Sequence, residues 1–301
     1  MIQAGTDTGG DALSFELLLD AIVLGMLVGC FYAAVSIGLS ISFGLLDVPQ
    51  VAHPAMLLLG SYGTYLLGRW GLDPLLAGVI LMPIFFLFGM ALYRGFHEIF
   101  EKRGEATGIG SLAFFFGVAL IIEVGLIMVF GVDQRAVEAP YIGSSITVGD
   151  IPLPIRMVVA FVVALLFTGG LILYLAKTFT GRAIRAVAQD EGALKLMGVD
   201  PVKIKQWAFG IATATTALAG ALLIVITPVD PNYYRLYIGR TFCVVVLAGP
   251  GSMGGTLIAG LILGISESIV LTMFGASWAQ AVSFGLLLVV LGLRPQGLFG
   301  R

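Results

Sequence analysis

Apolar residues in this chain run in long continuous stretches, not in the short alternating segments of a membrane β-barrel. The longer stretches each approach the ~20 residues with which a helix crosses ~30 Å of hydrocarbon. They cover residues 17–39, 74–93, 111–130, 157–176, 207–227 and 256–274. Shorter apolar pieces lie at 54–67, 241–248 and 279–293. The pattern predicts an all-α integral membrane protein with eight to nine transmembrane segments, forming a single polytopic domain over residues 1–301.

The composition supports a membrane location. Of the 301 residues, 58% are apolar and 11% are charged, and the mean hydropathy is +1.03. An ordinary soluble domain carries roughly 25% charged residues, and a soluble fold could not hide this much apolar surface. We therefore exclude a cytosolic enzyme, a nucleic-acid binder and a disordered chain, and we expect membrane lipid as a partner. Cys30 and Cys243 both lie in apolar stretches, where a disulfide is not expected.

Two stretches, 36–67 and 241–264, depart from the pattern of uninterrupted spans. Each has an apolar segment, a break containing Gly or Pro, and then a segment rich in small residues. One stretch lies in each half of the chain. Interrupted segments in corresponding positions of two halves are typical of the central site of a transporter. The alternative is that both breaks are ordinary loops at the membrane surface.

Basic residues predict the orientation, because loops that stay in the cytoplasm carry the excess of Lys and Arg. With the loop 178–203 placed in the cytoplasm, eleven of the 16 Lys and Arg residues fall on the cytoplasmic side. The N-terminus is then periplasmic and the C-terminus is cytoplasmic. This orientation requires an odd number of crossings, so the short piece 241–248 should cross at least partly.

The loop 178–203 has an amphipathic helical pattern. Gly192 would cost about 1 kcal/mol inside a helix, which favours two short helices or a bend near that residue. Gly198 would then end the second piece, and Asp200-Pro201 would start the next helix. Such a segment either docks in a groove of a partner protein or lies on lipid headgroups. The predicted apolar face comprises Ala183, Ala186, Val187, Leu194 and Met197.

Four ionisable residues lie at membrane depth or at the first break: Glu123, Glu267, Asp47 and His53. A charge at a helix centre costs at least ~2.5–3.5 kcal/mol, so such groups should face the bundle interior or water. The glutamates either contact a solute path or partner subunit, or donate an interhelical hydrogen bond to a Ser or Thr. His53, before Pro54 at an expected helix start, either lines a central site or bonds the loop backbone. A helix N-terminus there would suit a solute carboxylate.

Motifs for chemistry are lacking in the sequence. A phosphate-binding loop needs Gly-Lys-Ser/Thr, and no lysine follows a glycine here. The two histidines are far apart, and no metal-binding spacing of His or Cys occurs. We expect no catalytic residues, no metal and no cofactor on this chain, and no enzyme activity. ATP hydrolysis would need a separate chain.

Four motifs in chain order resemble the inner-membrane permease subunits of branched-chain amino-acid ABC transporters. The first comprises residues 43–44 (FG), 50–54 (QVAHP) and 60–62 (GSY), and the second comprises 181–190 (GRAIRAVAQD) and 196–199 (LMGV). The third is 247–255 (LAGPGSMGG), and the fourth is 293–300 (LRPQGLFG). The resemblance implies an importer subunit for a small amino-acid-like or related solute in the bacterial inner membrane. One implied partner is a related second permease subunit or a second copy of this chain. The others are a periplasmic binding protein and cytoplasmic ATPase subunits that hold ATP and Mg²⁺.

The resemblance also implies roles for particular residues. The segment 182–198 resembles a coupling helix that contacts the ATPase, and its implied coupling residues are Arg182, Arg185, Gln189, Asp190, Glu191 and Gly198. The candidate solute path comprises Phe43, Gln50, His53, Gly249, Pro250, Gly251 and Ser252, together with Glu123 and Glu267.

Two departures from the family pattern leave the solute open. Residues 50–54 read Gln-Val-Ala-His-Pro where the family usually has Asn-Phe-Ala-His-Gly, and Pro250 stands where a second Gly is usual. The family also carries urea, amides and aromatic acids. The alternative function is a stand-alone ion-coupled secondary transporter or channel, in which Glu123 and Glu267 would be the ion-coupling carboxylates.

Overall fold

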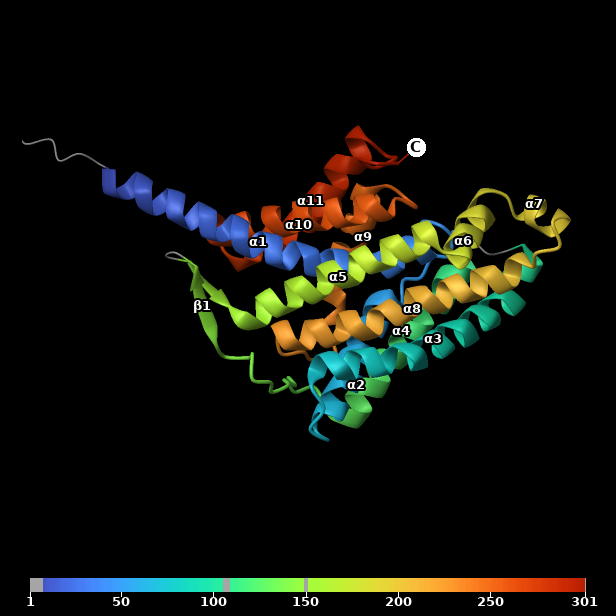
Figure 1. The fold of residues 1–301 in the computed structure, drawn as a ribbon, viewed down its shortest axis with the longest axis horizontal. Helices are drawn as coiled ribbons and strands as arrows, with labels where there is room; N and C mark the ends of the chain where they lie inside the picture. The colour runs from blue at the N-terminus through green and yellow to red at the C-terminus, as the bar shows by residue number, and fades with distance from the viewer. Residues whose placement is uncertain (1–7, 105–108, 149–150, 301) are drawn as a thin grey trace, which may run out of the picture.

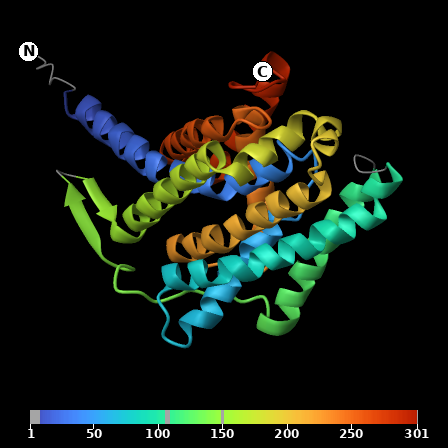
Figure 2. The same ribbon diagram turned by 45° about the vertical axis from the view of Figure 1, so that its right-hand side comes forward.

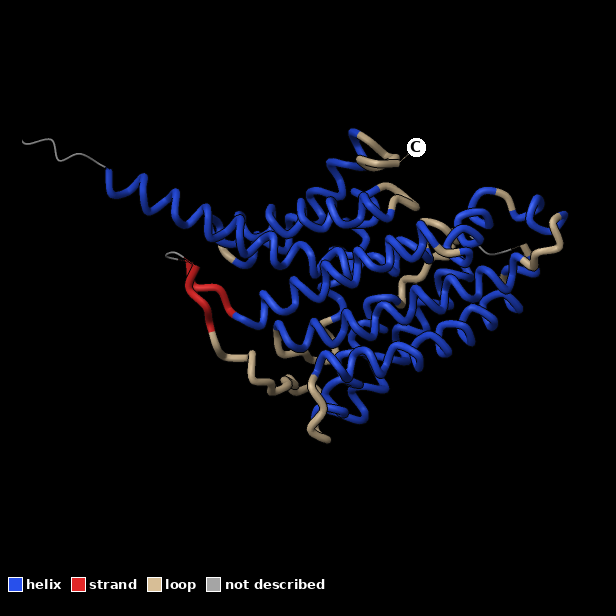
Figure 3. Tube along the Cα trace, in the orientation of Figure 1, coloured by secondary structure: helices blue, strands red, loops and turns tan. Residues whose placement is uncertain are grey.

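The computed structural model describes residues 8–104, 109–148 and 151–300, and these are mainly helical (Figure 3). A short antiparallel hairpin of β1 and β2 pairs Ser145 with Pro154 and Val148 with Ile151. In chain order the elements are α1 (Thr8–Ser42), α2 (His53–Gly68), α3 (Pro74–Ile99), η1 (Glu101–Arg103), α4 (Ile109–Phe130), β1 (Ser145–Val148), β2 (Ile151–Pro154), α5 (Ile155–Lys177), α6 (Phe179–Gln189), α7 (Glu191–Leu196), α8 (Pro201–Ile226), α9 (Tyr234–Ala248), α10 (Met253–Phe274) and α11 (Ala276–Leu293).

Within the described residues, seven helices are long and apolar enough to cross a membrane: α1, α3, α4, α5, α8, α10 and α11. This confirms an all-α membrane protein. The predicted count of eight to nine is not confirmed, because α2 and α9 have only 16 and 15 residues. Both short helices border a break, which limits their length at that end.

Helix α8 forms the centre of the bundle. In the most apolar stretch of α8, 89% of the residues are buried, compared with 17% in the corresponding stretch of α11. Small residues permit this, because they let neighbouring backbones approach closely. If Gly220 carried a side chain, its Cβ atom would lie 2.3 Å from the carbonyl oxygen of Leu57 on α2, which is too close. The two backbones therefore approach each other as only a glycine allows. At the same crossing, Ser61 Oγ donates to the Gly220 carbonyl at 2.7 Å.

Helices α1 and α10 pack through two matching Gly-x-x-x-Gly sequences, Gly25–Gly29 and Gly260–Gly264. A Cβ atom at Gly29 would lie 2.8 Å from the carbonyl oxygen of Gly260, and one at Gly264 would lie 2.4 Å from the Cα of Gly29. Larger side chains would therefore separate the helices. This contact brings the first and second halves of the chain together through backbone atoms, as small residues do in lipid.

The α6–α7 segment and the β1–β2 hairpin lie at opposite ends of the bundle (Figures 1 and 2). Near the hairpin end, Arg135 and Val229 exchange both backbone hydrogen bonds, at 2.8 and 2.9 Å. The predicted cytoplasmic loop and the loops on the other side are thus well separated. Residues 1–7 and Arg301, which the orientation prediction assigns to opposite sides, lie outside the described residues.

The predicted pair of short helices in the loop 178–203 is present, and the break lies at Asp190, near Gly192 as predicted. Asp190 has extended backbone angles, and its Oδ1 accepts a hydrogen bond from the amide of Ala193 at 3.0 Å. A side-chain cap therefore decides the boundary. Gly198 follows the end of α7 with a φ of +75°, and Asp200 caps α8, as expected.

The buried face of the α6–α7 segment differs in part from the prediction. Val187 and Leu194 are buried as expected, whereas Met197 is exposed. Gly181 and Ile184 complete the buried face of α6. A Cβ atom at Gly181 would lie 2.3 Å from the carbonyl oxygen of Leu175, so α6 folds back closely against the end of α5.

Candidate functional site

The two breaks, residues 43–52 and 249–252, touch each other. A Cβ atom at Gly44 would lie 2.3 Å from the amide nitrogen of Gly251. Just beside them, Ser40 Oγ and Thr256 Oγ1 form a hydrogen bond of 2.8 Å between α1 and α10. The first break follows the long helix α1 and precedes the short helix α2. The second break follows the short helix α9 and precedes the longer helix α10, so the order of lengths is reversed. The breaks therefore form one continuous interruption in the bundle.

The second break is a tight turn that explains the proline at position 250. Ser252 N donates to the carbonyl oxygen of Gly249 at 3.1 Å, and Gly251 has a φ of +78°. This is the pattern of a type II turn, in which proline suits the second position and glycine the third. Pro250 is thus compatible with this backbone. Ser252 then starts α10, with its Oγ accepting from the amide of Gly255 at 3.2 Å.

The C-terminal motif packs onto this turn. Leu298 N donates to the Leu247 carbonyl at 2.8 Å, and Phe299 N donates to the Ala248 carbonyl at 3.2 Å. A Cβ atom at Gly297 would lie 2.4 Å from the Cα of Gly249, so only glycine fits there. The third and fourth sequence motifs are therefore a single structural unit at the end of α9.

The predicted path residues separate into several groups. Phe43 joins the paired breaks, because its ring meets the ring of Phe242 edge to face at 5.8 Å. Gly249 and Gly251 belong to the same group through the turn. Pro250 is exposed there.

Gln50 and His53 form a second group, buried between α1, α2 and α8. His53 Nε2 lies 2.9 Å from the carbonyl oxygen of Val35, and Gln50 Nε2 lies 3.5 Å from Thr213 Oγ1. Among the described residues, Gln50 Oε1 and His53 Nδ1 have no hydrogen-bond partner. These free polar atoms make the α1–α2–α8 junction the second candidate for solute contact. Thr213 was not predicted, because α8 reads as an ordinary apolar span.

Glu123 on α4 is held by α9. Arg235 Nη2 lies 2.6 Å from Glu123 Oε1, and Tyr234 OH donates to Oε2 at 2.8 Å. The glutamate is buried, whereas the Arg235 side chain is largely exposed. The expected Ser or Thr partner is therefore wrong for Glu123: an arginine and a tyrosine occupy its two oxygens.

Glu267 on α10 has the same type of environment, but its arginine partner is more deeply buried than that of Glu123. Arg240 Nε donates to Glu267 Oε1 at 2.8 Å, and Tyr32 OH donates to Oε2. The Arg240 guanidinium also lies over the rings of Tyr32 and Tyr237, at 5.4 and 5.3 Å from their centroids. Here too an arginine and a tyrosine bond the two oxygens. The hydropathy pattern pointed to neither arginine, because the apolar signal of α9 begins only at Thr241.

The coupling candidates form an exposed surface on α6 and α7. Arg182 and Gln189 are exposed, and so is Gly198. Arg185 Nη2 donates to the Ala176 carbonyl at 3.2 Å, so it also caps α5. Asp190 caps α7, as described above, and Glu191 forms an ion pair with Lys205. The apolar side chains exposed on this surface are Phe179, Leu196 and Met197.

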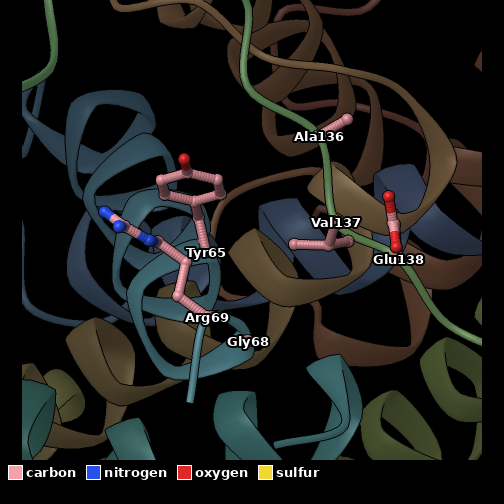
Figure 4. Close-up of a pocket in the computed structure, with 6 residues that line it drawn as sticks. All are labelled: Tyr65, Gly68, Arg69, Ala136, Val137 and Glu138. Atoms are coloured by element: carbon pink, nitrogen blue, oxygen red, sulfur yellow. The ribbon is translucent and has the colours of Figure 1, made fainter. Parts of the chain in front are cut away.

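A cavity of about 250 Å³ opens between the end of α2 and the loop 131–144. Figure 4 shows Tyr65 and Arg69 on the α2 side and Glu138 across from them. The loop is tied to the bundle, because Tyr141 OH donates to Asp73 Oδ1 at 3.3 Å. Burial and the Asp73 carboxylate raise the pKa of the Tyr141 phenol. The described residues contain no group of three His, Cys, Asp or Glu that could hold a metal ion.

Comparison with known proteins gives consistent matches over most of the chain. The chain is 28% identical to the high-affinity branched-chain amino acid transport system permease protein BraD of Pseudomonas aeruginosa, covering 94% of this chain and 96% of BraD. It is 26% identical to LivH of Escherichia coli, covering 95% and 97%. The ribose import permease protein RbsC of Haemophilus influenzae is 26% identical over 70% of this chain and 66% of RbsC. No solved structure matches significantly.

The family match agrees with the architecture described above. Residues 21–291 match the family described as the branched-chain amino acid transport system / permease component. The matched range begins in α1 and ends in α11, and so includes both breaks, α9 and the α6–α7 segment. The chain is a multi-pass inner-membrane protein that belongs to this permease family.

Proposed function

We propose that the chain is the permease subunit of an ABC importer, moving a small amino-acid-like solute across the inner membrane and driven by ATPase subunits on separate chains. Membership of the permease family supports the transport role. The relatives BraD and LivH are named as branched-chain amino acid permeases, which favours amino-acid-like solutes over other classes.

The observation that carries the proposal is the exposed α6–α7 segment. Leu196 is 92% exposed and Phe179 is 75% exposed, at the end of the bundle opposite the hairpin. Exposed large apolar side chains among charges are typical of a helix that docks in a partner's groove. Arg182 and Glu191 add charges on the same surface. We assign this surface to binding of the ATPase subunits. ATP and Mg²⁺ would be held by those subunits and not by this chain.

The geometry also suggests how the movement reaches the breaks. One residue, Thr178, separates α5 from α6, and α6 packs against both α5 and α8. A displacement of α6 would therefore move two helices of the bundle. The breaks, held together by Gly44 and Gly251, would rearrange to open the path alternately to each side.

The proposed assembly contains further subunits. We infer a related second permease subunit or a second copy of this chain, because a LivM permease is also 25% identical over 89% of this chain. A periplasmic binding protein would deliver the solute to the end that carries the hairpin. The cavity beside Tyr65, Arg69 and Glu138 lies on loops that such a protein would meet.

The alternative of an ion-coupled secondary transporter has less support. It would need a carboxylate that can take up and release a proton or cation. The two buried candidates, Glu123 and Glu267, are each already bonded to an arginine and a tyrosine. Such pairing occupies both oxygens of each carboxylate.

Reconstitution in proteoliposomes tests the proposal. The permease and its partner subunits are assembled with and without the ATPase subunits, and uptake of leucine, isoleucine, valine, urea and an aromatic acid is measured with ATP inside. We expect uptake only with the ATPase. Uptake driven by an ion gradient without the ATPase would contradict the importer function, whereas uptake of urea alone would contradict the solute class.

A further inference from the structure

A cluster of charged and polar side chains joins α7 to the ends of α3 and α8. Lys205 Nζ lies 2.6 Å from Glu101 Oε1 and also pairs with Glu191 of α7. The second oxygen of Glu101 accepts from Tyr93 OH at 2.7 Å and lies 2.6 Å from His97 Nδ1. One ammonium group therefore bridges two carboxylates from elements far apart in the sequence.

The two carboxylates are held very differently. Glu101 is largely buried and has three partners, whereas Glu191 is 46% exposed. Only 9% of the Lys205 side chain is exposed. Its ammonium group therefore needs at least one carboxylate to compensate for the lost hydration. Glu101 meets that requirement permanently. Glu191 can leave, because water can solvate its carboxylate at low cost.

An aromatic cluster gives Glu101 a rigid support. The Tyr93 ring lies 5.7 Å from that of Phe209 on α8, and Phe209 lies 5.9 Å from Phe115 on α4. Tyr93 and Phe115 are fully buried. The Lys205–Glu101 pair is thus attached to three helices at once, whereas α7 reaches Lys205 through the half-exposed Glu191.

We propose that Lys205 is a positioning residue that couples α7 reversibly to α3 and α8, with Glu101 as its permanent partner and Glu191 as its releasable one. The inference rests on the proposed function, in which the ATPase moves the α6–α7 segment. When α7 is pulled away, the Lys205–Glu191 pair separates and the Lys205–Glu101 pair remains. When α7 returns, the bridge is restored and the ends of α3 and α8 are again held to it.

The first test is Glu191→Gln in the complete complex, because this residue is half-exposed and the variant should fold. Uptake and ATP hydrolysis are measured on the same proteoliposomes. We expect the ATPase subunits still to co-purify, because Phe179 and Leu196 of the proposed docking surface are unchanged, while the solute moved per ATP falls about fivefold or more. Glu98→Gln is the matched control, since it removes an exposed Glu98–Lys102 pair near the same end of α3. It should leave the ratio unchanged.

The second test uses Lys205→Met and Lys205→Arg. The Met variant should lower the ratio of solute to ATP at least as much as Glu191→Gln, and the Arg variant, which keeps the charge, should restore part of it. If Glu191→Gln leaves the ratio at the wild-type value while the complex assembles, the inference is wrong and the proposed function stands. If the wild-type chain does not bind the ATPase at all, the proposed function itself is wrong.

Discussion

The backbone of Gly44 touches the backbone of Gly251, although the two residues lie in opposite halves of the chain. A Cβ atom at Gly44 would lie 2.3 Å from the amide nitrogen of Gly251 and 3.2 Å from its Cα. Backbone atoms cannot move aside as a flexible side chain can. This contact makes the two breaks one unit, so a change at either residue should affect both.

Gly44→Ala should destabilise the bundle at the paired breaks. Overpacking a close contact typically costs about 1–3 kcal/mol. We expect a lower midpoint of thermal unfolding in detergent and a loss of uptake. Gly254→Ala is the control, because Gly254 lies two residues beyond the second break. A Cβ atom added there would have no neighbouring atom within 4 Å. Equal unfolding midpoints for the two variants would contradict the contact.

Glu267→Gln should be more harmful than Glu123→Gln. Arg240 is mostly buried, and removing its carboxylate partner leaves an uncompensated charge, at a cost of roughly 3–5 kcal/mol. Arg235 is 61% exposed and can be solvated after Glu123 is changed. Thermal unfolding of both variants tests the difference. The double variant Glu267→Met with Arg240→Met should recover much of the loss, and failure to recover would indicate another role for Arg240.

Leu196→Asp should weaken binding of the ATPase without affecting insertion. Leu196 is 92% exposed on α7, so the substitution disturbs no internal packing. Co-purification of the ATPase with the tagged permease measures the effect. Ile146→Asp is the matched control, because Ile146 is an exposed apolar residue on the hairpin at the opposite end. A loss of binding for Ile146→Asp alone would reverse the assignment of the two ends.

Cysteine labelling should assign the two ends to the two sides of the membrane. The native Cys30 and Cys243 are buried and should contribute little background. Lys195→Cys on α7 and Ser144→Cys before β1 place one exposed thiol at each end. In intact spheroplasts, a membrane-impermeant maleimide should label Ser144→Cys only. Labelling of Lys195→Cys instead would place α7 in the periplasm, where no ATPase could reach it.

Local sequence signals predicted many features of the fold. The apolar stretches indicated the long spans, and the C-terminal end of α7 and the start of α8 followed from Gly198 and Asp200. These features depend on hydropathy and on hydrogen bonds between residues a few positions apart. The break between α6 and α7 lies near Gly192, as predicted, but the side chain of Asp190, which caps α7, sets its position.

The partners of the polar residues depended on the packing of helices that are distant in sequence. Glu267 could be recognised as a buried carboxylate, but its bond to Arg240 follows from the packing of α9 beside α10. The contact of Gly44 with Gly251, and the bridge of Lys205 between Glu101 and Glu191, arise in the same way. Hydropathy determines which segments enter the membrane. Only the close packing of those segments determines which side chains meet inside it.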